Sequence, residues 1–522
     1  MFRGRPKEWG PLDWGVALLA VLALVGGVIW FVQSRPGDCG DDLEPRGKDC
    51  VGVTAHAFET GDTAIDGLIR KVADENARVQ RERDDPEGRQ APVPYARIAL
   101  MMPFTADATS AMTHDTIRRG LAGALAAQQE ANRAGGGPHY QLLLAPDGRG
   151  LDQWEDVVDR LDELAQDKKT PLIGVTGIPN STAETRSAVA DLSGRSIPTV
   201  GPVISATSLN YQYLFKTSPN NEEFVRALDA YLREHRGEGS GFLVWDTREG
   251  DVYTKDLRKV IKERFDDKYD LDNRNAHFVG SSGDDQGMTR RFSDAATKIC
   301  GKKADTVFYA GRDQDLPYLI NRLAGEGSCD HRHKLRILKV GTGLDPALTT
   351  EDVKGDLTTI NATIVDASGY DPAWVKNRNT PPRGSAAFVA RFQKLAKTYK
   401  LGGKALDDGY AAMYYDGFTL LAGAVDRTYS EVHDTGDQKS DPMLLPSAKD
   451  IYGTLTTATL DGSHCDRCLQ GASGTYGFMG PGENDQWAVC KPVPIVEFPP
   501  GTGKPQPVYR TYRGGKAGAC PS

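Results

Sequence analysis

Short apolar runs and amphipathic stretches alternate along the chain from residue 95 onward. The first run, Arg97-Ile-Ala-Leu-Met-Met102, is ended by Pro103 and has the length and composition of a buried strand. Residues 154–166 have a helical period, because apolar residues recur there every three or four positions. Strands separated by helices predict βαβ units and a parallel sheet. The other predicted strands of this unit are 140–144, 172–175 and 197–200, and its other helices are 116–133 and 182–192.

The same alternation restarts after Pro219, so the chain predicts an α/β fold with two similar units in tandem. Two further helices are expected downstream, at 385–399 and 408–426, and residues 475–478 and 486–489 suit an antiparallel pair. The strands predicted for the second unit are 241–245, 277–279, 306–310, 336–340 and 362–365, and its helices are 222–234, 254–265, 288–299 and 315–323.

The N-terminus contains an uncharged apolar run from Trp14 to Val32, long enough to cross a hydrocarbon core of about 30 Å as a helix. Basic residues precede the run and acidic residues follow it, so the positive-inside rule places residues 1–13 in the cytoplasm and the remaining chain outside. The run exceeds a typical signal-peptide core, and no small-residue cleavage site follows closely, which favours an uncleaved anchor. Lipidation at Cys39 is disfavoured because Pro36-Gly-Asp38 does not resemble a lipobox.

Residues 33–94 are expected to form a juxtamembrane stalk or a small cap on the next domain. A helix is predicted at 63–83, where Ile65, Leu68 and Val72 follow helical spacing, and Pro92 and Pro94 come after it.

The net charge of −8 argues against a nucleic-acid-binding protein, which would have a basic footprint. The sequence also lacks the nucleophile-elbow, zinc-protease helix, phosphate-loop and dinucleotide-binding motifs. We therefore expect no enzyme, no cofactor and no catalytic residues, although a triad assembled in space would leave no such trace.

All eight cysteines lie on the expected outer side, where an even number indicates disulfides. We expect Cys39 to pair with Cys50 and Cys300 with Cys329, because each pair closes a short loop. An alternative for the later cysteines is a zinc site around Cys465-Asp-Arg-Cys468, which needs two more ligands. The cysteines whose pairing stays open are Cys465, Cys468, Cys490 and Cys520.

Six segments from about residue 95 to 500 together resemble the type I periplasmic-binding-protein superfamily, in its branched-chain amino-acid (Leu/Ile/Val) branch of ABC-transporter substrate-binding proteins. Each segment alone is a weak signal, and their order makes the resemblance specific for fold. The segments are Ile98-Ala-Leu-Met-Met-Pro103, Pro171-Leu-Ile-Gly174, Ile197-Pro-Thr-Val-Gly-Pro202, Tyr213-Leu-Phe-Lys-Thr-Ser-Pro219, Asp408-Gly-Tyr-Ala-Ala-Met-Tyr-Tyr-Asp416 and Gly471-Ala-Ser-Gly-Thr-Tyr-Gly-Phe478.

The resemblance implies two Rossmann-like lobes with parallel central sheets, joined by a three-segment hinge near residues 218, 366 and 465 and closing over a cleft. One transmembrane helix, residues 14–32, precedes them. The expected lobes are 95–217 with 366–465, and 218–365 with 466–512.

Ligands of open parallel sheets bind beyond the carboxyl ends of the strands, where helix N-termini offer free N–H groups. In the first lobe Ser181 and Thr182 stand at such a helix start, and Ser205 and Thr207 follow the next strand. Ser181 with Glu184 also matches a capping box, so Ser181 has a purely structural alternative. For Ser205 and Thr207 the alternative is a loop turn.

The second lobe offers Asp246, Tyr253 and Arg312 after its strands. Asp246 suits a ligand ammonium or a helix cap, and Arg312 suits an anionic group or a surface position. The family motif at this point matches Asp251-Val-Tyr253 only with a displacement, so the resemblance supports a ligand contact by Tyr253 less directly. Asp366 and Thr105 are the weakest candidates.

These observations predict a membrane-anchored extracytoplasmic solute-binding protein, which binds a small amino-acid-like ligand and works with an ABC permease. The alternative is an extracellular sensor or scaffold that acts through a membrane partner. No metal or nucleic-acid partner is expected.

Overall fold

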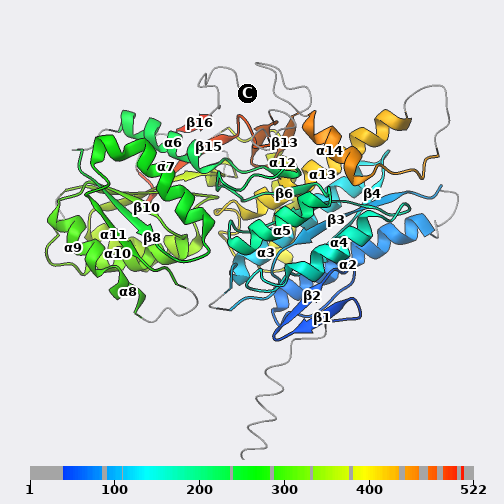
Figure 1. The fold of residues 1–522 in the computed structure, drawn as a ribbon, viewed down its shortest axis with the longest axis horizontal. Coiled ribbons are helices and arrows are strands. Elements are labelled where there is room, and N and C mark those ends of the chain that lie inside the picture. The colour runs from blue at the N-terminus through cyan, green and yellow to red at the C-terminus, as the bar shows by residue number, and fades with distance from the viewer. Residues whose placement is uncertain are drawn as a thin grey trace, which may run out of the picture.

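The computed structural model describes residues 39–84, 91–107, 110–235, 239–281, 287–329, 333–375, 380–433, 441–457, 468–478, 486–501 and 507–510. The predicted anchor at 14–32, Cys465 and Cys520 lie outside these residues. Among the helices within them, none combines the length and hydropathy needed to cross a bilayer. The described chain forms two α/β lobes side by side (Figure 1).

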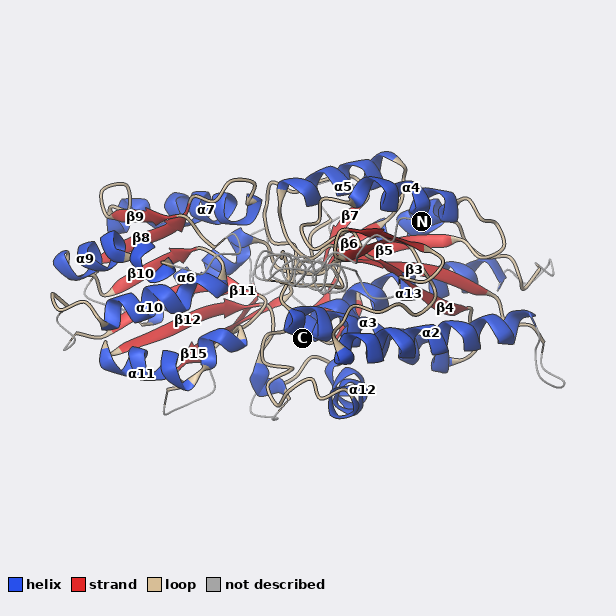
Figure 2. Cartoon of the chain, turned by 90° about the horizontal axis from the view of Figure 1, so that it is seen from below, coloured by secondary structure: helices blue, strands red, loops and turns tan. Residues whose placement is uncertain are grey.

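The first lobe is built on a parallel five-stranded sheet of order β4-β3-β5-β6-β7 (Figure 2). Alternate residues of β3 enter different cores: Ile98 and Leu100 pack beneath α3 and α13, while Ala99 and Met101 pack beneath α4 and α5. The predicted strands are all present, and β7 is an additional one. The strands are β3 (Tyr95–Met101), β4 (His139–Ala145), β5 (Leu172–Gly177), β6 (Thr199–Gly201) and β7 (Leu214–Lys216).

Helices from three parts of the chain cover this sheet (Figure 2). One of these helices, α13, comes from late in the chain and packs along α3. This packing places Gly123 directly against the backbone of Ala411, where a Cβ would collide. The helices are α2 (Thr63–Asp84), α3 (His114–Ala134), α4 (Trp154–Ala165), α5 (Ala183–Gly194), α12 (Ser385–Thr398), α13 (Tyr410–His433) and α14 (Ala448–Thr456).

The second lobe has a seven-stranded sheet of order β16-β15-β12-β11-β10-β8-β9. Its first five strands in sequence are parallel, whereas β15 and β16 add antiparallel edge strands from the end of the chain. The strands are β8 (Gly241–Asp246), β9 (Asn275–Phe278), β10 (Thr306–Ala310), β11 (Leu335–Gly341), β12 (Ala362–Ser368), β15 (Pro492–Phe498) and β16 (Val508–Arg510).

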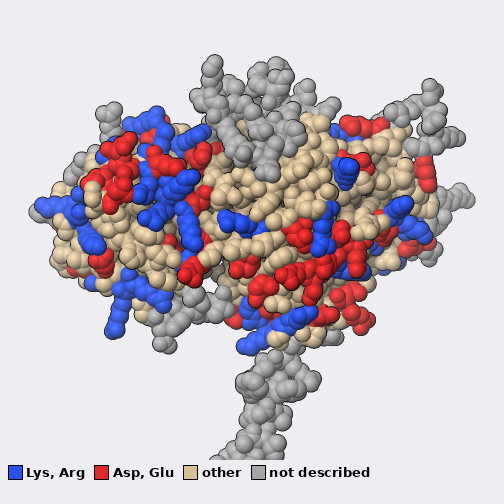
Figure 3. Space-filling model, viewed as in Figure 1, with Lys and Arg blue, Asp and Glu red and all other residues tan. Residues whose placement is uncertain are grey.

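The helices of the second lobe also lie on both faces of its sheet. One hydrophobic core joins the sheet to α6 and α7, and another joins it to the remaining helices. Acidic and basic side chains are mixed on the visible face of this lobe, whereas Asp and Glu predominate on the lower part of the first (Figure 3). The helices are α6 (Asn221–Glu234), α7 (Val252–Tyr269), α8 (Met288–Arg291), α9 (Ser293–Gly301), α10 (Leu316–Ala324) and α11 (Glu351–Thr359).

The chain passes between the sheets after β7, after β12 and before β15. The third passage lies later than the predicted position near residue 465. The hairpin β13 (Leu469–Gly471)–β14 (Gly474–Tyr476) still belongs to the first lobe, because it is fastened to α13. There Asp416 accepts hydrogen bonds from the backbone N–H groups of Ala472 at 2.6 Å and Ser473 at 3.0 Å. Trp487 then pairs with the end of β7. The buried Lys491 donates to Ser473 at 2.7 Å and to the Thr217 carbonyl, which ties the first and third passages together.

The segment before the first lobe packs onto it as a cap. The hairpin β1 (Leu43–Arg46)–β2 (Asp49–Gly52) leads into α2, where the buried Asn76 donates to the Leu142 carbonyl at 2.9 Å and accepts from the Leu142 N–H at 2.9 Å. An edge strand whose backbone is paired in this way is closed to other chains.

Both predicted local disulfides, Cys39–Cys50 and Cys300–Cys329, are present. Cys468 and Cys490 are disulfide-bonded as well, so neither sulfur is a thiolate that zinc would require.

Candidate functional site

A cavity of about 100 Å³ lies between the lobes, where the carboxyl ends of the strands of both sheets meet. Four of the predicted site residues line it: Ser181 and Ser205 from the first lobe, and Tyr253 and Arg312 from the second. The other polar residues around it are Asn180, Ser218, Asp313, Thr342, Asp345, Asp408 and Tyr410.

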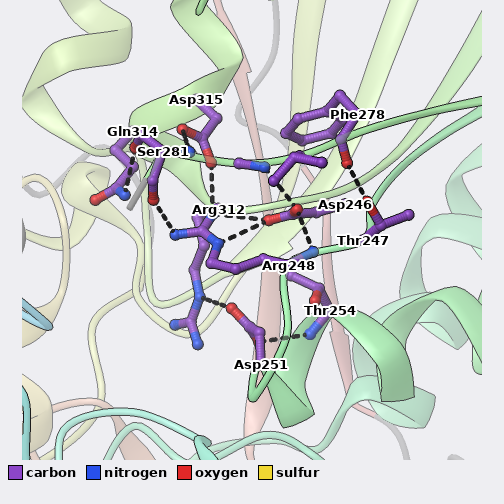
Figure 4. Close-up of polar contacts among 12 residues, drawn as sticks. Asp246, Thr247, Arg248, Asp251, Thr254, Phe278, Ser281, Arg312, Gln314 and Asp315 are labelled. Carbon is purple, nitrogen blue, oxygen red and sulfur yellow. Dashed lines mark hydrogen bonds and ion pairs between the residues drawn. The ribbon is translucent and has the colours of Figure 1, made fainter. Parts of the chain in front are cut away.

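Arg312, which follows β10, connects the two lobes. Its Nε donates to Asp251 at 2.7 Å (Figure 4). Its Nη1 donates to Asn180 of the first lobe at 3.0 Å, and its guanidinium lies 5.0 Å from the ring centre of Tyr253. Burial alone would raise the pKa of Asp251, but Arg312 holds the pKa below its usual range. The surface alternative for Arg312 is therefore wrong, since its side chain is only 22% exposed.

Three carboxyl groups, those of Asp313, Asp345 and Asp408, face the same cavity. Burial raises the pKa of Asp313 to about 7, although Lys339 lies 3.1 Å away and opposes the shift. Burial likewise raises the pKa of Asp408 to about 6 against the pull of Arg119, with which it is paired. The negative charge of Asp345 adds to both shifts, so the cavity favours either protons or a cationic group.

The predicted residue Asp366 lies beneath the cavity rather than on its wall. It is fully buried on β12 and accepts from Lys339 at 2.8 Å. Lys339 in turn holds Asp313, so Asp366 supports a residue of the cavity without reaching it.

Four further predicted residues make other contacts. Thr182, rather than Ser181, caps α5 and accepts from the Thr185 N–H at 3.2 Å. The backbone N–H of Thr207 donates to Asp256 of α7 at 2.9 Å, and Thr105 donates to Asp49.

Asp246 is the fourth of these residues. Its buried carboxylate accepts from Arg248 at 2.7 Å and from the Gly280 N–H at 2.8 Å, on the side of Arg248 away from Asp251 (Figure 4). The helix-cap alternative is also wrong, because Asp251 caps α7. Local sequence could not distinguish Asp246, which ends β8, from Asp251, which lies five residues later.

The lobes touch directly at one edge of the cavity. The Ser181 carbonyl accepts from the backbone N–H groups of Val252 at 3.0 Å and Tyr253 at 3.2 Å, and the Ala183 N–H donates to the Gly250 carbonyl at 3.0 Å. At another edge Gly343 lies against Asp408, where a Cβ would come within 2.7 Å of the Asp408 carbonyl carbon. The described conformation is therefore a closed one.

Sequence reasoning missed Asn180, Asp313, Asp345, Asp408 and Tyr410 as parts of the site. Asp408 and Tyr410 open one of the segments that carried the family resemblance, and that segment was used for the fold alone. Asp313 is adjacent to Arg312 and could have been included with it.

No protein-family model matches the chain, and no curated protein matches it either. Solved structures do match. A branched-chain amino-acid transporter substrate-binding protein from Streptococcus pneumoniae, in complex with isoleucine, is 17% identical, with 80% of this chain and 99% of that chain covered and a TM-score of 0.54. An ABC-transporter substrate-binding protein from Desulfitobacterium hafniense, in complex with leucine, is 16% identical, with 77% and 96% covered and a TM-score of 0.52.

A third similar structure is an ABC-transporter solute-binding protein from R. palustris in complex with 4-hydroxybenzoate. It is 15% identical, with 80% of this chain and 98% of that chain covered and a TM-score of 0.53. These similarities show the fold: the chain has the type I periplasmic-binding-protein fold of ABC-transporter substrate-binding proteins. The fold predicted from the six segments is confirmed.

Proposed function

We propose that this chain is an extracytoplasmic solute-binding protein, which holds a small amino-acid-like ligand between its lobes for an ABC-type importer. The observation that carries the proposal is the cavity at the carboxyl ends of both sheets, with polar groups from each lobe on its walls. The proteins with the same fold that were crystallised with leucine, isoleucine and 4-hydroxybenzoate support it.

The walls suit the two ends of an amino acid. An ammonium group would be attracted to the carboxyl groups of Asp313 and Asp345, while Ser181, Ser205 and Asn180 supply hydrogen-bonding groups for a carboxylate. A cavity of about 100 Å³ favours a small solute in this closed state.

The apolar run at residues 14–32 supports a single-pass anchor in the cell membrane, with the N-terminus in the cytoplasm and the lobes outside. Carbonate extraction of cells that express the chain with a C-terminal tag tests this. Full-length protein retained in the membrane pellet is expected, and a soluble mature chain that begins near residue 35 would contradict the anchor.

A thermal-melt screen of the purified protein tests ligand binding. The panel holds amino acids, small peptides, aromatic acids, polyamines and sugars, and a ligand at about a hundred times its dissociation constant should stabilise by about 2.7 kcal/mol. The shift should disappear in Ser205→Ala, at the cavity, and persist in Ser187→Ala, on an exposed turn of α5.

The direct contacts between the lobes favour a second candidate function, a sensor or scaffold that acts through a membrane partner. Backbone groups of Ser181 and Ala183 join the lobes directly, so contacts within the protein itself stabilise the closed conformation. A folded protein that responds to no compound of the panel, and that co-purifies with a membrane partner other than a permease, would support this candidate.

A further inference from the structure

A second cavity, of about 230 Å³, lies on the flank of the first lobe, away from the interlobe cleft. Its floor is the amino-terminal end of the sheet, where Tyr95 and Arg97 of β3 lie beside Gln141 and Leu143 of β4. The ladder places Arg97 opposite Gln141. Its other walls come from the capping segment, the end of α2 and α4: Asp42, Val53, Ala55, His56, Gln80, Arg160 and Leu164.

Two nearly buried polar side chains in the floor have unused hydrogen-bonding groups. Tyr95 is 4% exposed and Gln141 is 3% exposed. The amide nitrogen of Gln141 donates to the Asn76 carbonyl at 3.1 Å, whereas its Oε1 and the Tyr95 hydroxyl have no hydrogen-bond partner among the described residues. Neither oxygen is both enclosed and unpartnered, so both are open to the cavity and available to an occupant.

Arg97 adds a positive charge that is only partly used. One nitrogen donates to Asp167 at 3.3 Å. Asp167 also accepts from the Thr170 hydroxyl at 2.9 Å and from the Lys169 N–H at 2.8 Å, so it is satisfied largely without Arg97. A guanidinium has five N–H donors in a fork that matches an oxyanion.

The remaining charged wall groups are engaged with neighbours. Arg160 pairs with the exposed Glu163 at 2.6 Å. Asp42 accepts from Thr54 at 2.9 Å and lies 3.8 Å from His56. The Tyr95 hydroxyl can donate as well as accept, so Arg97 and Tyr95 offer an oxyanion two donor groups side by side in the floor.

We propose that this flank cavity is a second binding site, for the carboxylate or phosphate group of a small solute. Arg97 and the Tyr95 hydroxyl hold the oxyanion, Gln141 accepts from a neighbouring hydroxyl or amine, and Arg160 closes the outer wall. The capping segment is part of the wall, so an occupant would fasten that segment to the first lobe.

Isothermal titration of the full-length chain with inorganic phosphate and, separately, with succinate tests the site. We use about 0.15 M salt, because α4 beside this cavity carries exposed acidic residues and salt screens their field. At least one anion should bind with a dissociation constant below about 1 mM. Arg97→Gln should weaken that binding at least tenfold, and whether phosphate or succinate responds identifies the class of anion.

Two matched controls separate this site from others. Arg312→Gln removes the cleft arginine and Arg226→Gln removes a surface arginine of the second lobe, and neither should change the binding. If Arg97→Gln does not fold, judged by its thermal melt, the exposed Arg160→Gln replaces it with an expected weakening of several-fold. Failure of both anions to bind, or binding that only Arg312→Gln abolishes, would overturn the proposal without touching the function proposed for the cleft.

Discussion

Asp313→Asn should make the protein more stable near neutral pH, although it removes a partner of a buried lysine. Lys339 has a side chain that is 1% exposed and contacts two carboxyl groups, Asp366 at 2.8 Å and Asp313 at 3.1 Å. One ammonium cannot neutralise two carboxylates, so an excess negative charge is confined beside the cleft once both are ionised.

The pH dependence follows from the pKa of Asp313, which burial and the neighbouring carboxylates raise from 3.8 to about 7. A carboxyl whose pKa is higher in the folded chain contributes stability that is fully present below about pH 4 and is lost as the pH rises through about 7. Between about pH 5 and about pH 7, an interval of about two pH units, the free energy of unfolding should fall by about 2.7 kcal/mol. Because the side chain is 24% exposed, we expect roughly half of this, about 1–1.5 kcal/mol.

Urea denaturation near pH 5 and near pH 8 measures the effect in the wild-type chain and in Asp313→Asn. The stability of the variant relative to wild type should rise by about 1 kcal/mol or more between the two conditions. Asp352→Asn, an exposed change of equal charge on α11, should show no such rise. An equal loss of stability at both pH values would show that Lys339 needs Asp313 as a counter-ion, and would refute the reasoning.

Three other substitutions test the architecture. Asp416→Ala should lose about 3–5 kcal/mol in urea denaturation, because two buried N–H groups and the Ser473 hydroxyl lose their acceptor and the buried Lys491 loses a nearby negative charge; a loss below about 1 kcal/mol would contradict this. Asp256→Ala should increase the radius of gyration in small-angle scattering, since Asp256 holds Thr207 of the first lobe; an unchanged radius would show that this contact does not keep the lobes closed. Replacing Cys300 and Cys329 by Ala should lower the stability by about 3 kcal/mol, which an unchanged urea midpoint would disprove.

The two cavities differ in what a bound solute would do to the hinge. A solute in the cleft contacts both lobes, so it shifts the balance between open and closed states by its differential affinity for them. A solute in the flank cavity contacts only the first lobe and its cap. Phosphate or succinate should therefore leave the small-angle scattering profile unchanged, whereas a cleft ligand should favour the compact form.

The local pattern of the sequence determined the elements and the class of fold. Apolar runs such as 97–102 and 306–310 became buried strands, and the spacing of Ile65, Leu68 and Val72 placed α2. Local disulfides were also predictable, because short loops bring cysteines together. These features depend on neighbours within a few residues, which periodicity and chain length report directly.

Only the tertiary structure decided which polar residues meet. Arg312 and Asn180 are 132 positions apart, and their contact depends on how the two lobes close. Asp246 is the aspartate that the sequence predicts for the ligand, yet Arg248 covers it, whereas the unpredicted Asp251 caps α7 and binds Arg312. The third crossing of the chain between the lobes comes later than predicted for the same reason, because Asp416 fastens the distant β13–β14 hairpin to the first lobe. Such choices rest on long-range contacts, which local pattern does not encode.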